Sequence, residues 1–236
     1  MNALQYLRKY AYYYIYAIAL TLVLNTWVTK SATQVSSVLE VSSRPVLVID
    51  AGHGGIDGGT TSCTGVLESE LNLEIAQRLN GLFRLLGYET IMTRTTSDSI
   101  ATEGDTIRAQ KVSDLKNRVN IVNDAANTIL FSIHQNYYPQ SQYYGPQVFY
   151  NDSAKDLATN VQHGLNGLTE KQDRSCKKSS GVYLMDHISQ PGILIECGFL
   201  SNPTEEAKLR QPEYQKMLCC VIACSASQYI ESNLVS

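Results

Sequence analysis

Hydrophobic residues gather in short runs along residues 45–236, and stretches with helical spacing separate these runs. Buried strands are predicted over residues 46–49, 89–93, 129–133, 147–150, 182–185 and 193–195. Between Glu70 and Leu86 the apolar residues recur every three or four positions, which predicts an amphipathic helix that ends at Gly87. Further helices are predicted around residues 115–126, 153–168 and 213–230.

The alternation of these strands and helices defines the expected fold. It indicates the α/β class, with a mostly parallel, twisted sheet and helices on both of its faces. Neither an internal repeat nor a second folded domain is visible, so a single domain over residues 45–236 is expected. In such a sheet, functional groups lie where loops leave the carboxyl ends of the strands.

The first thirty residues have a different character. Arg8 and Lys9 precede an almost wholly apolar run from Ala11 to Val28. At 1.5 Å per residue this run spans roughly 27 Å, close to the thickness of a bilayer core. Residues 1–30 are therefore expected to be a signal peptide or a membrane anchor, with a buried helix of a soluble fold as the third alternative. Either leading alternative places the domain outside the cytosolic membrane, after a linker over residues 31–44.

Composition narrows the class of protein. With 236 residues, of which 44% are hydrophobic, the chain can bury a full core. The net charge of -3 argues against nucleic-acid binding, since phosphate contacts need a basic surface. The six cysteines form no C-x-x-C pair, so they are expected to be mainly reduced or buried.

Four residues that can bind a metal or transfer a proton lie at the ends of these predicted elements. His53, His134 and Glu196 each follow a strand, and Glu68 stands just before the first amphipathic helix. Each histidine can equally be an ordinary loop residue, and Glu68 can be an acid favoured by the helix dipole. Glu196 is harder to explain in this way, because its apolar surroundings make an unpartnered carboxylate costly.

Four segments of the sequence resemble those of a known enzyme family. VIDAGHGGIDGG, LESELNLEIA, FSIHQN and ILIECGFLSNP are similar to segments of the zinc-dependent N-acetylmuramoyl-L-alanine amidases, the third amidase family. They occur in the family's order and spacing, so the resemblance covers residues 45–231. It implies that His53, Glu68 and His134 bind Zn²⁺ and that Glu196 is the catalytic carboxylate. Two imidazoles and one carboxylate leave a fourth position open, as in catalytic zinc sites.

The resemblance also implies a reaction and a biological setting. The expected reaction is hydrolysis of the amide bond between N-acetylmuramic acid and L-alanine in peptidoglycan, with Glu196 as the general base and acid. The chain looks most like the short spore-cortex members, which implies removal of stem peptides during formation of cortex muramic-δ-lactam, in the intermembrane space of the forespore. A zinc peptidase that cuts within the stem peptide and a non-catalytic wall-binding or scaffold module remain as alternatives.

Further residues are secondary candidates. Glu70 is the rival of Glu68 as a metal ligand, although the family register favours Glu68. Arg118 and Arg174 match positions where the family tends to carry arginine. Arg174 is a candidate contact for a carboxylate of the stem peptide, with the alternative that it pins its own loop. His187 is a second candidate for substrate binding, in a stretch where this chain departs from the family pattern.

A loop rich in tyrosine, YYPQSQYY at residues 137–144, is a candidate contact for a partner of the domain. Its aromatic faces could stack on sugar rings or contact another protein, and the alternative is a rigid surface loop. No wall-binding repeat is apparent in the sequence, which suggests an accessory protein that targets or stabilises the domain. The membrane is a further expected partner if the N-terminal segment is retained.

Overall fold

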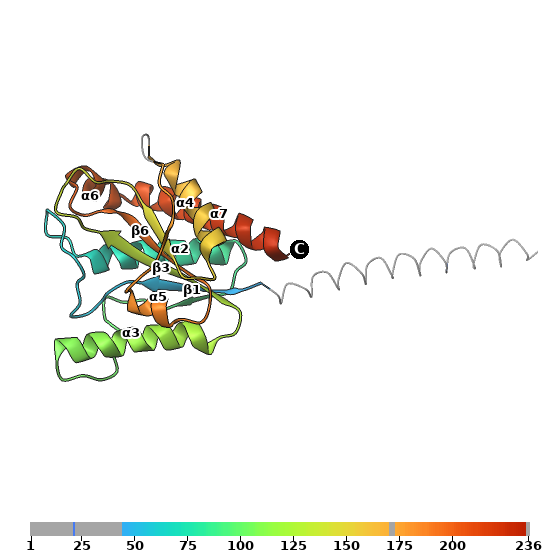
Figure 1. Ribbon diagram of the computed structural model, residues 1–236, viewed down its shortest axis with the longest axis horizontal. Coiled ribbons are helices and arrows are strands. Elements are labelled where there is room, and N and C mark those ends of the chain that lie inside the picture. The colour runs from blue at the N-terminus through green and yellow to red at the C-terminus, as the bar shows by residue number, and fades with distance from the viewer. Residues whose placement is uncertain (1–20, 22–43, 170–172, 235–236) are drawn as a thin grey trace, which may run out of the picture. The chain divides into compact units, whose positions relative to one another are not determined.

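The computed structural model describes residue 21 and residues 44–169 and 173–234 (Figure 1). Contacts divide the chain into two units, residues 1–43 and 44–236. Apart from residue 21, the predicted signal peptide or anchor over residues 1–30 lies outside the described residues, and so does nearly all of the predicted linker. Among the residues that are described, no helix is both long enough and apolar enough to cross a membrane.

A six-stranded sheet forms the centre of the folded unit (Figure 1). Its strands are β1 (Val46–Ala51), β2 (Thr90–Met92), β3 (Thr128–Asn136), β4 (Gln147–Tyr150), β5 (Lys177–Lys178) and β6 (Gly192–Phe199). Their order across the sheet is β2-β1-β3-β6-β4-β5. β2, β1, β3 and β6 are parallel, whereas β4 runs antiparallel to β6 and pairs with β5 in parallel. The prediction of a mostly parallel sheet is therefore confirmed.

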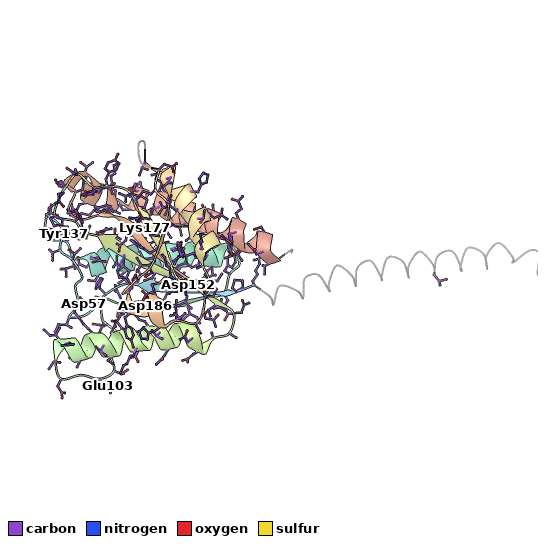
Figure 2. All side chains as sticks on the ribbon, viewed as in Figure 1. Asp57, Glu103, Tyr137, Asp152, Lys177 and Asp186 are labelled. Carbon is purple, nitrogen blue, oxygen red and sulfur yellow. The ribbon has the colours of Figure 1, made fainter. Side chains whose placement is uncertain are left out.

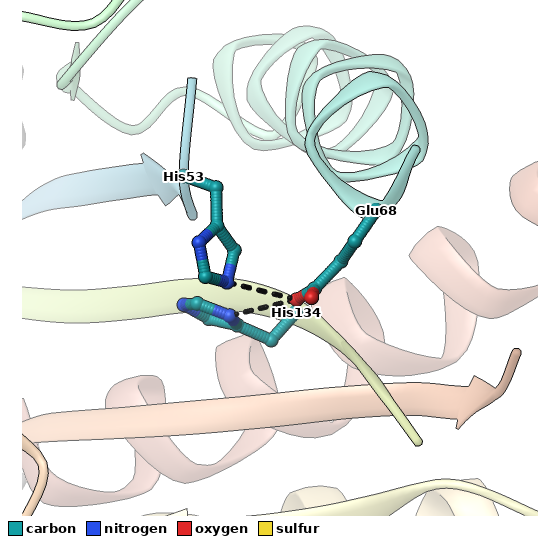
Figure 3. A group of neighbouring side chains, drawn as sticks. All are labelled: His53, Glu68 and His134. Atoms are coloured by element: carbon teal, nitrogen blue, oxygen red, sulfur yellow. Dashed lines mark hydrogen bonds and ion pairs between the residues drawn. The ribbon is translucent and has the colours of Figure 1, made fainter. Parts of the chain in front are cut away.

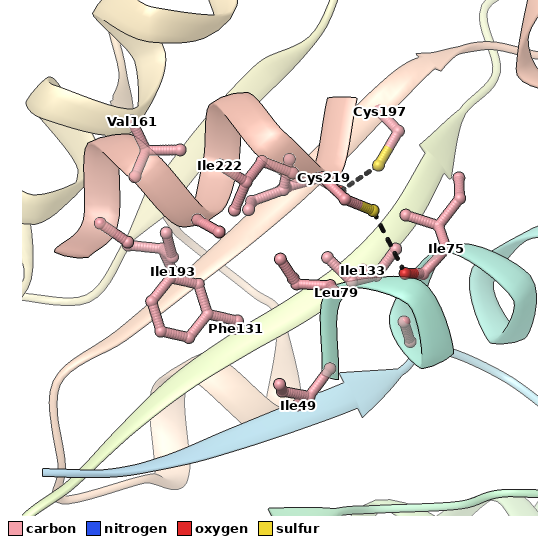
Figure 4. Close-up of a cluster of buried hydrophobic side chains, with 14 of the residues drawn as sticks. Ile49, Ile75, Leu79, Phe131, Ile133, Val161, Ile193, Cys197, Cys219 and Ile222 are labelled. Atoms are coloured by element: carbon pink, nitrogen blue, oxygen red, sulfur yellow. Dashed lines mark hydrogen bonds between the residues drawn. The ribbon is translucent and has the colours of Figure 1, made fainter. Parts of the chain in front are cut away.

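Helices cover both faces of this sheet (Figure 1). One face carries α2 (Glu68–Leu85), α4 (Lys155–Asn166), α6 (Pro203–Leu209) and α7 (Pro212–Leu234), and the other carries α3 (Ile107–Asp124) and α5 (Tyr183–His187). Side chains alternate between the two layers along each strand. Ile49, Phe131 and Ile193 pack into the first layer with residues of α2 and α7 (Figure 4). Val48 and Leu194 belong to the smaller second cluster.

One predicted strand is wrong. Residues 182–185 were expected to extend along the sheet, but the helix α5 begins at Tyr183. Gly181 has a φ of +75°, which turns the chain, and Leu184, Met185 and Ile188 then pack on the sheet from one side of a helical turn. A run of four apolar residues has no periodicity that distinguishes a strand from a helix.

Two short elements were not predicted. β5 has two exposed residues, so no apolar run marks it. α6 does carry a recognisable start, because Asn202 caps the amides of Thr204 and Glu205 and Pro203 occupies the first turn. Its seven residues are too few for a clear hydrophobic periodicity.

Candidate active site

Three side chains from separate segments converge where the parallel strands end (Figure 3). His53 follows β1, Glu68 is the first residue of α2, and His134 lies near the end of β3. His53 Nε2 is 3.3 Å from Glu68 Oε1, and His134 Nδ1 is 3.0 Å from the same oxygen. The three ligand atoms all lie within 4.8 Å of one another. Glu70 is exposed in the first turn of α2 and is not part of this group.

His134 and Glu196 sit within strands, although the sequence pattern predicts them just after strands. β3 continues to Asn136 and β6 to Phe199. The two residues are register partners on neighbouring parallel strands, so their side chains point to the same face of the sheet. In both strands the backbone pairing continues beyond the apolar run. Polar side chains are tolerated there because this part of each strand faces a cleft.

The loop after β1 holds His53 in a conformation that non-glycine residues rarely adopt. Its φ is +61°, in the left-handed region. His53 Nδ1 lies 2.9 Å from Asp57 Oδ2, and this contact turns Nε2 towards Glu68. Asp57 is itself paired with Lys111 Nζ on α3 at 2.8 Å. A carboxylate behind an imidazole fixes the tautomer and ring orientation, as it does around metal-binding histidines.

Glu68 is buried and surrounded by donors. Its Oε2 accepts a hydrogen bond from Thr60 N at 2.9 Å, and its Oε1 accepts from Gln135 N at 3.1 Å and from Asn72 Nδ2 at 3.3 Å. Burial alone raises the pKa of Glu68, but its contacts with the two histidines outweigh this and hold the pKa well below its usual range. Glu68 is therefore an ionised carboxylate, ready to bind a cation.

Two glycines leave room for the side chains of His53, Glu68 and His134. A Cβ atom at Gly52 would lie 2.8 Å from Cδ2 of the His134 ring and closer still to Cε1 and Nε2. At Gly59 a Cβ atom would lie 2.6 Å from Glu68 Oε2 and 2.9 Å from His53 Cδ2, and the φ of Gly59 is +70°. Backbone alone fits against the cluster at both positions.

The donor set fits a zinc ion. With bonds of about 2.1 Å and tetrahedral angles, two ligand atoms of zinc lie about 3.4 Å apart, close to the 3.3 Å and 3.0 Å found here. The site also favours positive charge. Burial lowers the pKa of His53, but Glu68 and Asp57 outweigh that effect and raise it to about 9. Imidazole and carboxylate ligands together suit zinc better than they suit calcium or magnesium.

Glu196 lies beside this cluster on β6. Its Oε2 is buried and has no hydrogen-bond partner among the residues that the structure describes. Burial raises the pKa of Glu196 to about 7, against the opposing effect of His134. An unpartnered buried oxygen costs free energy, so its retention needs a reason. A group that exchanges protons with a bound reactant provides such a reason.

Arg118 on α3 holds the backbone that carries His53. Its guanidinium donates to the carbonyl oxygens of Ala51 at 2.8 Å and His53 at 2.7 Å. It also pairs with Asp50 and, through Nε at 2.6 Å, with Asp114. The side chain is only 2% exposed, so its main role is to position the loop.

Arg94 makes a second clamp that the sequence patterns do not single out. It donates from Nε to Ala51 O at 2.8 Å, and from Nη2 to Gly52 O at 3.0 Å and Ser69 O at 2.8 Å. It thereby joins the loop of His53 to the first turn of α2. The available signal was a charged residue directly after the strand predicted over residues 89–93.

A cavity of about 320 Å³ opens beside His53 and His134, on the face of the sheet that carries α3 and α5. Lys111 of α3 and the segment 181–184 line two of its sides, and Leu194 of β6 lies on the sheet side. The cavity gives a reactant access to both histidines.

Arg174 and His187 do not line this cavity. Arg174 donates from Nη2 to Tyr144 O at 2.7 Å and lies over the Phe199 ring at 5.5 Å, which favours the alternative that it pins a loop. The His187 ring stacks on Tyr183 with centroids 3.9 Å apart, at the exposed end of α5. Substrate binding by either residue remains a prediction.

Comparison with known proteins identifies the relatives of this chain. The family model Amidase_3, described as N-acetylmuramoyl-L-alanine amidase, matches residues 47–225. The germination-specific N-acetylmuramoyl-L-alanine amidase of Bacillus subtilis is 36% identical over 177 residues, which cover 73% of this chain and 74% of the relative. LytC of the same organism, also an N-acetylmuramoyl-L-alanine amidase, is 29% identical over 174 residues, or 72% of this chain and 32% of LytC.

Solved structures show the same fold. The CwlD amidase from Clostridioides difficile, solved in complex with the GerS lipoprotein, superposes with a TM-score of 0.76 at 33% identity, covering 80% of this chain and 99% of that one. An N-acetylmuramoyl-L-alanine amidase from Clostridium difficile 630 superposes with a TM-score of 0.69 at 31% identity, covering 80% and 98%.

Proposed function

The chain belongs to the Amidase_3 family of N-acetylmuramoyl-L-alanine amidases, and from this membership we propose that it works with a zinc ion bound by His53, Glu68 and His134. It hydrolyses the amide bond between N-acetylmuramic acid and L-alanine in peptidoglycan. The observation that carries the zinc proposal is the convergence of two imidazoles and one ionised carboxylate within 4.8 Å.

The residues of this chain have distinct parts in the reaction. A zinc ion at these donors supplies Lewis-acid polarisation of the lactyl carbonyl. Glu196 accepts a proton from the attacking water at Oε2 while the oxygen of that water bonds to the carbonyl carbon. When the carbon–nitrogen bond breaks, Glu196 returns the proton to the nitrogen of the departing L-alanine. Asp57 keeps the His53 ring in the orientation that directs Nε2 towards Glu68, where it would help to hold the ion.

The biological setting follows from the relatives. One is named a germination-specific amidase, and another is solved with the GerS lipoprotein. We propose that this chain removes stem peptides from spore-cortex peptidoglycan, as a step towards muramic-δ-lactam, and that an accessory lipoprotein assists it. Because peptidoglycan lies outside the cytosolic membrane, the domain acts there, and the apolar run over residues 11–28 is proposed to export or anchor it.

The test is product analysis with the full-length protein on purified peptidoglycan. Intact stem peptides that begin with L-alanine are expected by mass spectrometry, with loss of activity in a chelator and recovery on adding zinc. Glu196→Gln is expected to retain zinc and lose about 10²- to 10⁴-fold in kcat, whereas Glu70→Gln, an exposed control, stays active.

Other outcomes would reject parts of this proposal. Unchanged kcat in Glu196→Gln would remove Glu196 from the mechanism. Products cut within the stem would indicate a peptidase. Binding to the wall without any product, in the presence of zinc, would indicate a scaffold module.

A further inference from the structure

The loop between β3 and β4 presents an exposed aromatic surface. Tyr137, Tyr138 and Tyr143 are 51%, 46% and 39% exposed, and together we call them the tyrosine shelf. Large aromatic side chains dominate the energetics of cores and interfaces, so a group of three on the surface indicates a contact with another molecule.

Hydrogen bonds hold the shelf against the start of α6. Tyr138 N donates to Ser201 Oγ at 3.1 Å. Asn202 Nδ2 donates to the carbonyl oxygens of Ser141 at 2.8 Å and Tyr143 at 3.2 Å. The backbone that carries the rings is thus fixed before any ligand arrives.

Two of the three rings are also packed against aromatic neighbours. Tyr138 meets Tyr143 edge to face with centroids 4.8 Å apart, and Tyr143 stacks on Phe199 at 6.3 Å. The Arg174 guanidinium lies over the Phe199 ring, 5.5 Å from its centroid, and donates a hydrogen bond to Tyr144 O. A ligand therefore meets a pre-organised surface, which reduces the entropy lost on binding.

The shelf adjoins the candidate active site. Tyr137 follows His134 by three residues, about 10 Å along an extended chain. Phe199, beneath Tyr143, lies on β6 three residues after Glu196. Tyr137 and Asp57 lie at the same end of the domain, Tyr137 towards α6 and Asp57 towards α3 (Figure 2). The shelf and the cavity therefore flank the site from opposite faces of the sheet.

Peptidoglycan extends from the scissile amide in two directions with different chemistry. The glycan strand is a continuous polymer, so it needs an open surface, and its sugars have apolar ring faces bordered by hydroxyl groups. Tyrosine offers a flat apolar face with a hydroxyl at its tip. We propose that the tyrosine shelf binds sugar rings of the glycan strand next to the muramic acid that is cleaved. This inference rests on the amidase activity, which makes the glycan a substrate.

The size of the shelf favours a sugar over a protein. The exposed parts of the three tyrosine residues amount to roughly 300 Å², whereas a stable protein interface covers about 800 Å² on each partner. One or two sugar rings can be covered by a surface of this size. A protein partner would need a much larger surface around it.

Binding of bare glycan strands, from which stem peptides have been removed, tests this without catalysis. By calorimetry on the full-length protein, Tyr137→Leu and Tyr138→Leu are each expected to weaken binding about five- to tenfold, or about 1–1.4 kcal/mol. Tyr138→Phe keeps the ring and is expected to stay within about twofold of the wild type. Met217→Ala on α7, where Met217 is 46% exposed like Tyr138, is the control and should not change the affinity.

Kinetics separate this inference from the amidase itself. The leucine variants should raise KM on long glycan strands that carry stems, and leave kcat and the cleavage of a single-sugar muramoyl dipeptide unchanged. If the wild type binds bare strands through the shelf but releases no stems, the shelf is supported and the amidase proposal fails. Wild-type glycan affinity in both leucine variants overturns the shelf. The shelf is also overturned if the leucine variants keep their glycan affinity and lose only the stimulation by an accessory protein.

Discussion

A methyl group added at Gly52 tests the position of the His134 ring. The new Cβ atom would lie 2.8 Å from Cδ2 of that ring and closer to Cε1 and Nε2, whereas ordinary van der Waals contacts begin at 3.4 Å. The ring must therefore move by well over half an ångström. It has little freedom to do so, because its Nδ1 is bonded to Glu68 and β3 is held between β1 and β6.

Such a shift is large for a metal ligand. Zinc–ligand distances deviate by only about 0.2 Å from their preferred values. Mutating a residue that only hydrogen-bonds to a metal ligand already lowers the metal affinity about 10- to 100-fold. Displacing His134 itself in Gly52→Ala is therefore expected to weaken zinc binding by at least about 100-fold. Overpacking by one methyl group should lower the free energy of unfolding by only about 1–3 kcal/mol, so the domain stays folded.

The assay is a zinc titration of the full-length protein in competition with a chelator, with urea unfolding of the zinc-free protein alongside. Gly81→Ala is the matched control, since its Cβ atom would meet nothing within 4 Å on α2. It should keep the zinc affinity and gain up to about 1 kcal/mol of stability. Wild-type zinc affinity in a folded Gly52→Ala variant would refute His134 as a ligand.

Three further predictions concern charged residues in and around the site. Glu68→Ala should lose zinc and Glu70→Ala should keep it; metal analysis showing loss only from the second would exchange their assignments. Arg118→Met leaves Asp50 buried without its cation, so the free energy of unfolding should fall by about 3–5 kcal/mol, and a loss below about 1 kcal/mol in urea would contradict this. Burial raises the pKa of Asp50, but Arg118, His134 and the hydrogen bonds from Ser132 and Thr93 together outweigh it and lower the pKa from 3.8 to about 2. The resulting stabilisation, about 2 kcal/mol, is complete above about pH 4 and disappears as the pH falls towards 2; equal urea stability at pH 6 and pH 3 would refute it.

The elements around the metal candidates were predictable because each carries a strong hydrophobic pattern. β1 and β3 are apolar runs buried on both faces, and α2 has an apolar stripe. Parallel strands bring their carboxyl ends to one edge of the sheet, so His53 and His134 follow from the topology once the strands are placed. The match to family segments then supplied Glu68, which local propensity alone would treat as an acid at a helix start.

Features that depend on contacts between distant segments could not be predicted. The segment 182–185 forms a helix because Leu184 and Met185 pack on the sheet after the turn at Gly181, and four apolar residues carry no signal of that packing. Arg94 was missed for a similar reason. Its acceptors are backbone carbonyl oxygens, among them those of Ala51 and Gly52 some 40 residues earlier, and a carbonyl oxygen has no identity in a sequence.

The same contacts explain why charged groups are buried behind the site. A buried ion pair such as Asp50 with Arg118 adds little stability over a well-packed apolar pair of the same size, because desolvation offsets the attraction. Yet Arg118 also donates to the carbonyl of His53, whose φ of +61° is a strained conformation that only surrounding contacts maintain. Asp50 orients Arg118, and Arg118 holds the backbone that aims the imidazole. The pair is therefore best understood as a means of keeping His53 in place, and its loss should disturb metal binding as well as stability.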